Sequence, residues 1–490
     1  MKNADVIIVG AGPVGLLTAI ELTLGGARVM VLERLAEPSP AMKAMGFGAV
    51  GAEALQRRGL TAGMAAAEVR NAEVMRQFTQ QTGADLKARW SKYSGHFAGL
   101  LIRKDEANPQ RRAHQVTQPD LEALLAERAE ALGIVMRRQC EVTSFEARDD
   151  GVTVDVAAPE GPERLTCDWL VACDGGRSTI RKMAGFAFPG TDPTSTFYQV
   201  IADIDHPEAL LPPGWRRTEG GVFSYGPIPG RLFMLDFSGP PKDRNAPVTR
   251  DEVERVLRQV SGQDVRVTAL HSASRWGDNT RLADSYRRGR VLLAGDAAHV
   301  HSPFGGQGLN LGLVDAANLG WKLAAVVRGD LPDTLLDTYT AERRPVAEAV
   351  LANTLAQVAI LRPDPQSGAM RDLLARLMGF DDVNGYIRGM MSGTATRYEL
   401  GAEDDIIGRL LGDMPLGEGV SLYELMQDGS GVLLDGTGGT ATLMAMSIPR
   451  LRCVAVSGGP SLLIRPDACV AWAGEGTAGL EDALRHWFRM

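Results

Sequence analysis

Three glycines close to the start of the chain have the spacing of a turn that binds the phosphates of a dinucleotide. Gly10, Gly12 and Gly15 follow an apolar run at residues 5–9 and precede a helical run that reaches Leu24. In such a turn the first glycine permits a tight bend, the second lets the backbone approach a pyrophosphate, and the third lets the helix pack closely on the strand. The N–H groups at the start of the helix then face the phosphates. The predicted site also includes the residues between the second and third glycines, Pro13 and Val14.

An acidic residue stands where this kind of turn needs a partner for the ribose. Glu33 follows a second apolar strand, residues 28–32, and such an acid is expected about 20 residues after the glycines. A carboxylate there accepts hydrogen bonds from ribose hydroxyls and disfavours a 2′-phosphate. The residues therefore predict FAD or NAD(H) rather than NADP(H), with Glu33 and Arg34 in the site. The alternative is a glycine-rich turn without a ligand.

A second group of polar residues follows another apolar strand, residues 169–173. Asp174 comes at the end of this strand, where its carboxylate can hold the N–H groups of a loop or a ligand. Arg177 and Arg181 are spaced to lie on one face of a following helix. A strand–turn–helix cap with a pair of surface arginines is the alternative interpretation.

A third group is a long loop after the strand at residues 290–294. Gly295 and Asp296 open the loop, and the carboxylate of Asp296 is placed to accept hydrogen bonds from a polyol. The loop then enters a helix, whose first N–H groups can stabilise the negative charge that a reduced flavin carries near N1 and O2. His299 and His301 lack nearby carboxylates, so we expect no metal site. The loop residues assigned to the cofactor site are Pro303, Gly306, Gln307, Gly308, Leu309 and Asn310.

These turns require an α/β scaffold, and together they suit one extended ligand that is held at both ends. A chain of 490 residues is longer than a single core, which stops growing at about 250–300 residues. We therefore expect a Rossmann-like domain in two parts, residues 1–184 and 273–400, the second with a helical extension. An antiparallel sheet at residues 185–272 is expected as an insertion that binds substrate, and a small β/α domain at residues 401–490.

The composition excludes several classes of partner. The net charge is −8, so no basic excess is present to bind nucleic acid. The five cysteines contain no CxxC pair, which disfavours a disulfide framework or a zinc site. No uncharged apolar stretch approaches the ~20 residues that a membrane span needs. We expect a cytoplasmic protein that does not bind a membrane.

With these motifs in place, the chain resembles the class A flavoprotein aromatic hydroxylases, the family of para-hydroxybenzoate and phenol hydroxylases. It is most similar to the polyketide hydroxylases that act on anthracycline and angucycline intermediates. The resemblance covers essentially the whole chain, and residues 462–472 match a thioredoxin-like C-terminal domain. Further matches are the family landmarks after the third motif, Asp315, Asn318, Leu319, Trp321, Lys322, Tyr339 and the run Glu342, Arg343, Arg344, Pro345.

The resemblance adds positions to the expected FAD site. Gln118 matches a residue that touches the ribityl chain, and Val142 is also assigned to the cofactor. Lys43 stands where the family usually has an arginine near the flavin, so the charge is kept but the planar fork is lost. Asp174 and Arg177 match positions implicated in NAD(P)H binding.

The resemblance also implies the reaction. FAD, bound tightly but not covalently, is reduced by transient NAD(P)H, with NADPH the favoured form, and reacts with O₂. A flavin C4a-hydroperoxide then hydroxylates a polycyclic aromatic phenol of the polyketide type in secondary metabolism. Alternatives are Baeyer–Villiger insertion into a polyketide ketone, non-catalytic binding of a polyaromatic product, and an NAD-dependent dehydrogenase. A homodimer is an assembly that the resemblance allows.

No catalytic side chain is assigned, because the flavin carries the chemistry. The substrate pocket should lie between the FAD-binding domain and the inserted sheet. Six aromatic residues of the sheet are candidates for its lining, although each is also a candidate for the ordinary core of the sheet. These residues are Phe197, Tyr198, Phe223, Tyr225, Phe233 and Phe237.

Overall fold

A six-stranded, mostly parallel sheet forms the centre of the molecule. The computed structural model describes residues 2–39, 44–82, 92–243, 246–417 and 419–489. Within them the strand order is β17-β18-β9-β1-β2-β5. These strands are β1 (Val6–Val9), β2 (Val29–Leu32), β5 (Val135–Arg137), β9 (Trp169–Ala172), β17 (Arg287–Arg288) and β18 (Val291–Leu293). All neighbours are parallel except β17, which is antiparallel to β18. The apolar runs form buried strands because helices cover such a sheet.

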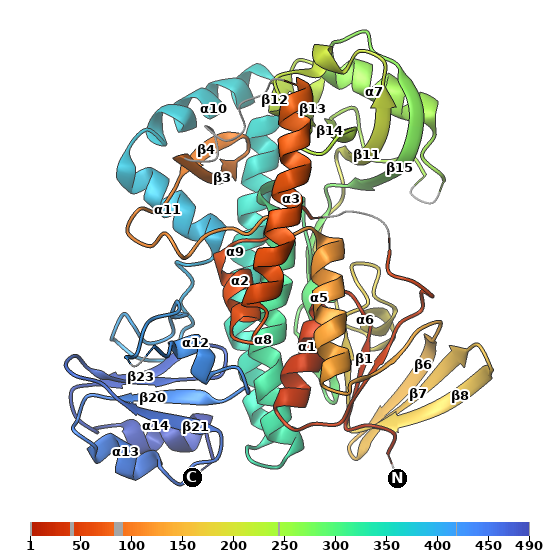
Figure 1. Cartoon of the computed structure of the whole chain (residues 1–490). Helices are drawn as coiled ribbons and strands as arrows, with labels where there is room; N and C mark the ends of the chain where they lie inside the picture. The colour runs from red at the N-terminus through yellow and green to blue at the C-terminus, as the bar shows by residue number, and fades with distance from the viewer. Residues whose placement is uncertain (1, 40–43, 83–91, 244–245, 418, 490) are drawn as a thin grey trace.

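Long helices pack beside the sheet and run through the middle of the molecule (Figure 1). They are α1 (Pro13–Leu24), α2 (Ala49–Gln56), α3 (Thr61–Thr82), α5 (Gln118–Ala131), α8 (Gln307–Val327) and α9 (Asp337–Leu361). Helix α1 directly contacts α8 and α5, and Gly320 of α8 approaches α1 so closely that a Cβ there would lie 2.2 Å from the Cβ of Glu21. The strand, helix and second strand that were expected at the start of the chain are therefore confirmed.

An antiparallel sheet is inserted between the two halves of this domain. Its strand order is β12-β13-β14-β11-β15, and α7 packs on one face. The elements are β11 (Thr196–Ile204), β12 (Gly214–Thr218), β13 (Gly221–Tyr225), β14 (Arg231–Asp236), α7 (Arg250–Ser261) and β15 (Val267–Gly277). Figure 1 shows this unit at the upper right, beside the end of α3.

Smaller elements complete this part of the chain. Hairpins lie at β3 (Tyr93–Phe97) with β4 (Leu100–Arg103), and at β6 (Glu141–Arg148), β7 (Gly151–Ala158) and β8 (Gly161–Cys167). Short segments are α6 (Thr179–Met183), β10 (Gly190–Thr191), β16 (Thr280–Leu282) and β19 (His299–Val300). Helices α10 (Pro365–Leu377) and α11 (Asp381–Ser392) follow α9.

The C-terminal part has the strand order of a thioredoxin fold. Strand β20 pairs in parallel with β21 and antiparallel with β22, and β22 pairs antiparallel with β23. The elements are α12 (Leu422–Leu425), β20 (Gly431–Asp435), α13 (Thr440–Ala445), β21 (Leu451–Ala455), β22 (Ser461–Ile464), β23 (Val470–Gly474) and α14 (Leu480–Trp487). The expected α/β class with inserted and C-terminal units is confirmed.

A buried network of charges joins the C-terminal unit to α8 and α9. The guanidinium of Arg465 lies 2.7 Å from the carboxylate of Glu342 and 2.6 Å from that of Asp467. The ammonium of Lys322 lies 2.9 Å from Glu342, and Asn318 donates to both Glu342 and Asp467. All five side chains are at most 4% exposed. Several landmarks of the resemblance therefore hold the two units together, outside the cofactor cavity described below.

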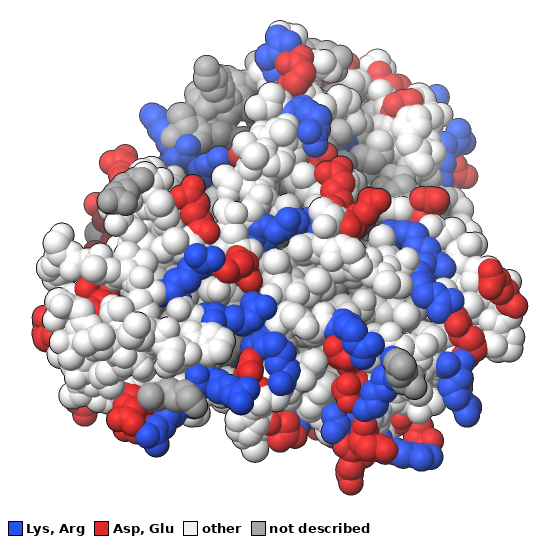
Figure 2. Space-filling view, turned by 60° about the horizontal axis from the view of Figure 1, so that its bottom comes forward, with Lys and Arg blue, Asp and Glu red and all other residues white. Residues whose placement is uncertain are grey.

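Charges of both signs are mixed over the face of the molecule seen in Figure 2. Among the described residues, no helix combines the length and the apolar character that a bilayer span requires.

Candidate flavin and substrate site

A cavity of about 2620 Å³ opens at the carboxyl ends of the parallel strands. This is the edge at which ligands bind in open α/β sheets. The cavity continues from the two glycine-rich turns to the inserted sheet. Sites for one small ligand measure roughly 300–1,000 Å³. The space is therefore sufficient for a dinucleotide together with a second molecule.

The first turn has the geometry that its glycines predict. Gly10 has a positive φ of 106°, and a Cβ there would lie 2.4 Å from the carbonyl oxygen of Cys173. A Cβ on Gly15 would lie 2.0 Å from the carbonyl oxygen of Gly10. By contrast, no atom lies within 4 Å of the place for a Cβ on Gly12, which lines the cavity. The first and third glycines thus permit the turn, and the second leaves space that a ligand can enter.

Glu33 lies at the end of β2 with its carboxylate in the turn. Its two oxygens accept hydrogen bonds from the N–H groups of Ala11, at 2.8 Å, and Leu35, at 2.9 Å. Glu33 and Arg34 both line the cavity. The carboxylate is therefore fixed by the backbone while it faces the space expected for a ribose.

Asp174 holds the start of α6, as expected. Its Oδ2 accepts from the N–H groups of Thr179, at 2.8 Å, and Ile180, at 3.3 Å. Its Oδ1 is buried, and no described residue gives it a hydrogen bond. Arg181 points inward and donates to the carbonyl of Ala297 at 2.8 Å. Arg177 precedes α6 and is exposed at the cavity. The expected pairing of the two arginines on one helix face is wrong, because the helix begins only after Arg177.

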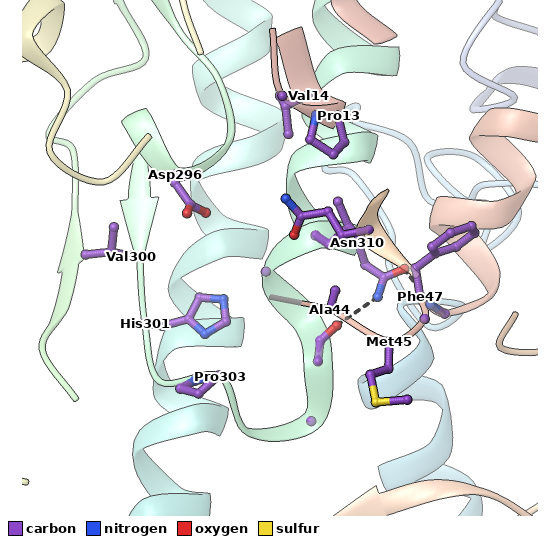
Figure 3. A pocket seen from close by; sticks show the side chains of 18 of the residues that line it. Pro13, Val14, Ala44, Met45, Phe47, Asp296, Val300, His301, Pro303 and Asn310 are labelled. Atoms are coloured by element: carbon purple, nitrogen blue, oxygen red, sulfur yellow. Dashed lines mark hydrogen bonds between the residues drawn. The ribbon is translucent and has the colours of Figure 1, made fainter. Parts of the chain in front are cut away.

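The third motif forms a further part of the cavity wall. Figure 3 shows Asp296, His301 and Pro303 on one side of the open space and Asn310 on the other. The loop turns sharply because Gly305 and Gly306 have φ angles of 78° and 60°, and α8 begins immediately afterwards. The loop thus directs the start of a helix of 21 residues into the cavity.

Asn310 links this loop by hydrogen bonds to the segment at Gly48, which is distant in sequence. Its Oδ1 accepts from the N–H group of Gly48 at 2.7 Å, and its Nδ2 donates to the carbonyl of Gly306 at 3.1 Å. The turn near the N-terminus and the later loop also meet directly. A Cβ on Gly295 would lie 3.0 Å from Val14, so the two motifs are side by side.

Most of the expected cofactor residues line this one cavity. They are Gly10, Gly12, Pro13, Val14, Glu33, Arg34, Gln118, Val142, Asp174, Asp296, Pro303, Gly306, Gly308, Leu309 and Asn310. Gly15, Gly295 and Gln307 are buried behind it, where the glycines permit close packing and Gln307 accepts from Asn353 at 2.7 Å. Lys43 lies outside the described residues.

His301 lines the cavity, although the sequence analysis considered it only as a metal ligand and expected no metal site. Its Nδ1 lies 2.7 Å from the carbonyl oxygen of Ser302 and must donate to it. Burial lowers the pKa of His301, which favours the neutral ring. Its Nε2 is buried and has no partner among the described residues, and the ring points into the cavity (Figure 3). The neutral side chain therefore presents a hydrogen-bond acceptor to the cavity. His301 belongs to the loop of residues 295–306, which is called the flavin loop below.

Behind His301, a buried ion pair supports the loop. Asp315 of α8 accepts from His299 at 2.7 Å, from Arg343 at 2.8 Å and from the N–H group of Gly295 at 3.2 Å. Burial alone would raise the pKa of Asp315, but Arg343 and His299 lower it overall. Asp315 therefore stays ionised and holds the start of the loop.

The inserted sheet corrects the expected lining of the substrate pocket. Tyr198, Phe223 and Tyr225 do not line the cavity, because they pack with Val256 and Leu257 of α7 on the other face of the sheet. Side chains alternate between the two faces of a strand, so their neighbours face the cavity instead.

On the cavity side, Phe197 and Phe237 pack in an aromatic cluster behind the lining, and only Phe233 of the six candidates reaches it. The sequence analysis did not indicate several lining residues on this side, among them His96, Gln199, Trp215, Ser224, Arg231, Ser274 and Trp276. Polar residues such as Gln199 have no aromatic ring, so residue type alone does not predict that they line the cavity.

The open glycine cradle, the ribose-facing carboxylate and the unpartnered acceptors of Asp174 and His301 fit a bound dinucleotide. The fold and site thus define a dinucleotide-binding oxidoreductase with room for an organic substrate. Comparisons with known proteins narrow this class. Residues 3–354 match the family described as FAD binding domain, and residues 404–489 match the one described as aromatic-ring hydroxylase, C-terminal.

Two curated relatives extend over nearly the whole chain. One is 12-dehydrotetracycline 5-monooxygenase/anhydrotetracycline 6-monooxygenase of Streptomyces rimosus, 40% identical over 99% of this chain and 98% of the relative. The other is rifampicin monooxygenase of Streptomyces venezuelae, 39% identical over the same shares. The solved structure of CabE, an aromatic hydroxylase from angucycline biosynthesis, has a TM-score of 0.84 and 34% identity over 99% of each chain.

The chain belongs to the FAD-dependent aromatic-ring hydroxylases. It is a flavoprotein monooxygenase that uses NAD(P)H and O₂ with FAD as its cofactor, which confirms the resemblance seen in the motifs.

Proposed function

We propose that this monooxygenase hydroxylates a polycyclic aromatic phenol of the polyketide type in the cytoplasm. The observation that carries the proposal is the single cavity that runs from the flavin turns to the aromatic wall at Trp215, Phe233 and Trp276. Relatives that are named for tetracycline and rifampicin oxidation support this substrate class, and the free cysteines suit a reducing compartment.

The chain's own residues would hold the cofactor at several points. The open side of Gly12 and the start of α1 would receive the pyrophosphate, and Glu33 the ribose. Asp296 would accept from the ribityl hydroxyls beside Gln118. The N–H groups at the start of α8 would stabilise negative charge on the flavin ring. Asp174 and Arg177, at the cavity edge, are proposed to meet the transient NAD(P)H.

When bound, FAD would carry two electrons from NAD(P)H to O₂, with one oxygen atom entering the substrate and the other leaving as water. The protein's part is to place the aromatic ring against the flavin and to exclude water. Phe233 provides an apolar wall where the flavin loop meets the sheet, and Phe197 and Phe304 pack behind it, with ring centroids 5.5–6.2 Å apart.

The test is a screen of polycyclic phenols for stimulated NAD(P)H oxidation by the FAD-containing protein, with the product mass recorded. We expect a stimulating phenol to yield a product that is heavier by one oxygen atom. A lactone product would instead indicate Baeyer–Villiger insertion. If no polycyclic phenol stimulates oxidation, the proposal fails and the non-catalytic binder is favoured.

A further inference from the structure

One register row of the inserted sheet faces the cavity with a residue from every strand. Ser224 is opposite Trp215 on β12 and Phe233 on β14, and Gln199 of β11 is opposite both Phe233 and Ser274 of β15. All five residues line the cavity. The row therefore combines aromatic walls with polar groups and crosses the whole sheet.

Arg231 lies on the same face as this row, two residues before Phe233 on β14, and it also lines the cavity. Two residues along a strand span ~7 Å. On the other side of the row, Phe304 of the flavin loop contacts Phe197 and Phe233, with ring centroids 5.5 and 6.2 Å apart, and Phe197 belongs to the next row in that direction. Arg231 is therefore at the end of the sheet's cavity wall that is remote from the flavin loop.

The guanidinium of Arg231 lacks a counter-charge within the part of the chain that the structure describes. Burial lowers the pKa of Arg231 to about 10, and its Nε is buried with no hydrogen-bond partner in the described ranges of the chain. The contrast is Arg275 on β15, whose guanidinium lies 2.6 Å from the carboxylate of Glu252. Arg231 remains charged at neutral pH, its side chain is only partly exposed, and a charge withdrawn from water without a partner is costly.

We propose that Arg231 binds an anionic oxygen of the substrate. The substrate class is then a polycyclic aromatic compound with an ionised carboxylate or enolate at the end remote from the ring that is oxidised. A guanidinium matches such oxygens with two parallel hydrogen bonds, and Gln199 and Ser224 in the neighbouring row can donate to further oxygens. The inference rests on the proposed function and names the substrate class of the same site.

The decisive test is binding of matched probes to the FAD-containing protein. The probes are anthraquinone-2-carboxylate, its neutral carboxamide, and 2-acetyl-1,3-indandione as an enolate. We expect the native protein to bind the carboxylate or the enolate at least tenfold more tightly than the carboxamide, and whichever anion binds more tightly identifies the kind of oxygen. Comparable binding of all three probes overturns the proposal, whatever any variant does.

Variants then test whether Arg231 is responsible. Arg231→Gln should abolish the preference for the anion while it changes carboxamide binding by less than twofold. Arg231→Lys should retain part of the preference, because the charge stays while the fork is lost. The control is Arg255→Gln, which removes the same charge from an exposed position on α7 and should leave the preference unchanged.

The result separates this inference from the proposed function. Equal weakening of all probes in Arg231→Gln, or an unchanged preference, overturns the inference even if phenols are hydroxylated. If the Arg231→Gln protein does not retain its flavin, the test is decided by the preference for the anionic probes in the native protein and in Arg231→Lys. Absence of stimulated NAD(P)H oxidation with every probe and phenol would contradict the proposed function, while the binding comparison would still decide the role of Arg231.

Discussion

At the scale of single residues, Gly12 is a position where a bound ligand requires a glycine although the fold does not. Its φ of −75° is accessible to any residue, and a Cβ there meets no atom within 4 Å. We therefore expect Gly12→Val to keep the stability of the flavin-free protein within about 0.5 kcal/mol but to weaken FAD binding more than tenfold, because the side chain fills the place of the pyrophosphate.

Flavin absorbance per protein and quenching of flavin fluorescence measure this effect. The matched control is Gly476→Val, at an exposed glycine that also has nothing within 4 Å of its Cβ position. Retention of a full complement of tightly bound FAD by Gly12→Val would contradict the assigned pyrophosphate site.

The residues that could be predicted are those whose requirement is local. Glycine is required at positions 10 and 15 because of a positive φ or because a backbone atom lies closer than 2.5 Å to the place of a Cβ. The same requirement applies wherever this kind of turn occurs. Arg231 and His301 could not be predicted in this way. Their significance is that each has a buried nitrogen without a partner among the residues that the structure describes, and a sequence does not show which side chains remain unpaired.

At the scale of elements, the inserted sheet shows that a strand pattern does not predict which face of a sheet lines a cavity. Both faces of β11, β13 and β14 are buried, so apolar and aromatic residues occupy both. The composition of the segment indicated a sheet, but only the packing of α7 on one face and of the flavin loop on the other decides which aromatic residues meet the cavity.

Because the two faces of the sheet have different roles, substitutions on one face should lower stability and substitutions on the other should weaken substrate binding. Phe223→Ala should lower the free energy of unfolding by ~3–5 kcal/mol, because Phe223 is 1% exposed under α7, while the KM for a phenolic substrate stays within twofold. Phe233→Ala should raise that KM at least fivefold, because its ring faces the cavity. Denaturant unfolding and steady-state kinetics check both, and an altered KM in a folded Phe223→Ala would place the pocket on the wrong face.

At the scale of the whole molecule, the buried charges at Glu342 make stability depend on acidic pH. Burial alone would raise the pKa of Glu342, but Arg465 and Lys322 lower it well below its ordinary value of 4.5. A carboxyl group whose folded pKa is depressed contributes stability above its unfolded pKa and loses it as the pH falls further. The stabilisation should therefore be complete above about pH 4.5 and decline below it.

Glu342→Gln should lower the free energy of unfolding at neutral pH by ~3–5 kcal/mol, because two buried cations would then share Asp467. It should also flatten the loss of Tm on acidification. The control is Glu348→Gln on the same helix, where the carboxylate is exposed and 3.7 Å from Arg344, with an expected cost of at most about 0.5 kcal/mol. Parallel Tm curves for Glu342→Gln and the native protein would contradict this role.

The same network limits how the chain can be divided. Arg465 is 0% exposed, and its guanidinium contacts Glu342, which lies in the FAD-binding part of the chain. A cut between these two parts would leave both fragments with charged side chains exposed to water that are buried in the intact chain. The last ninety or so residues are thus needed for the stability of the enzyme and do not form a separable module. Shortened versions for engineering should retain them.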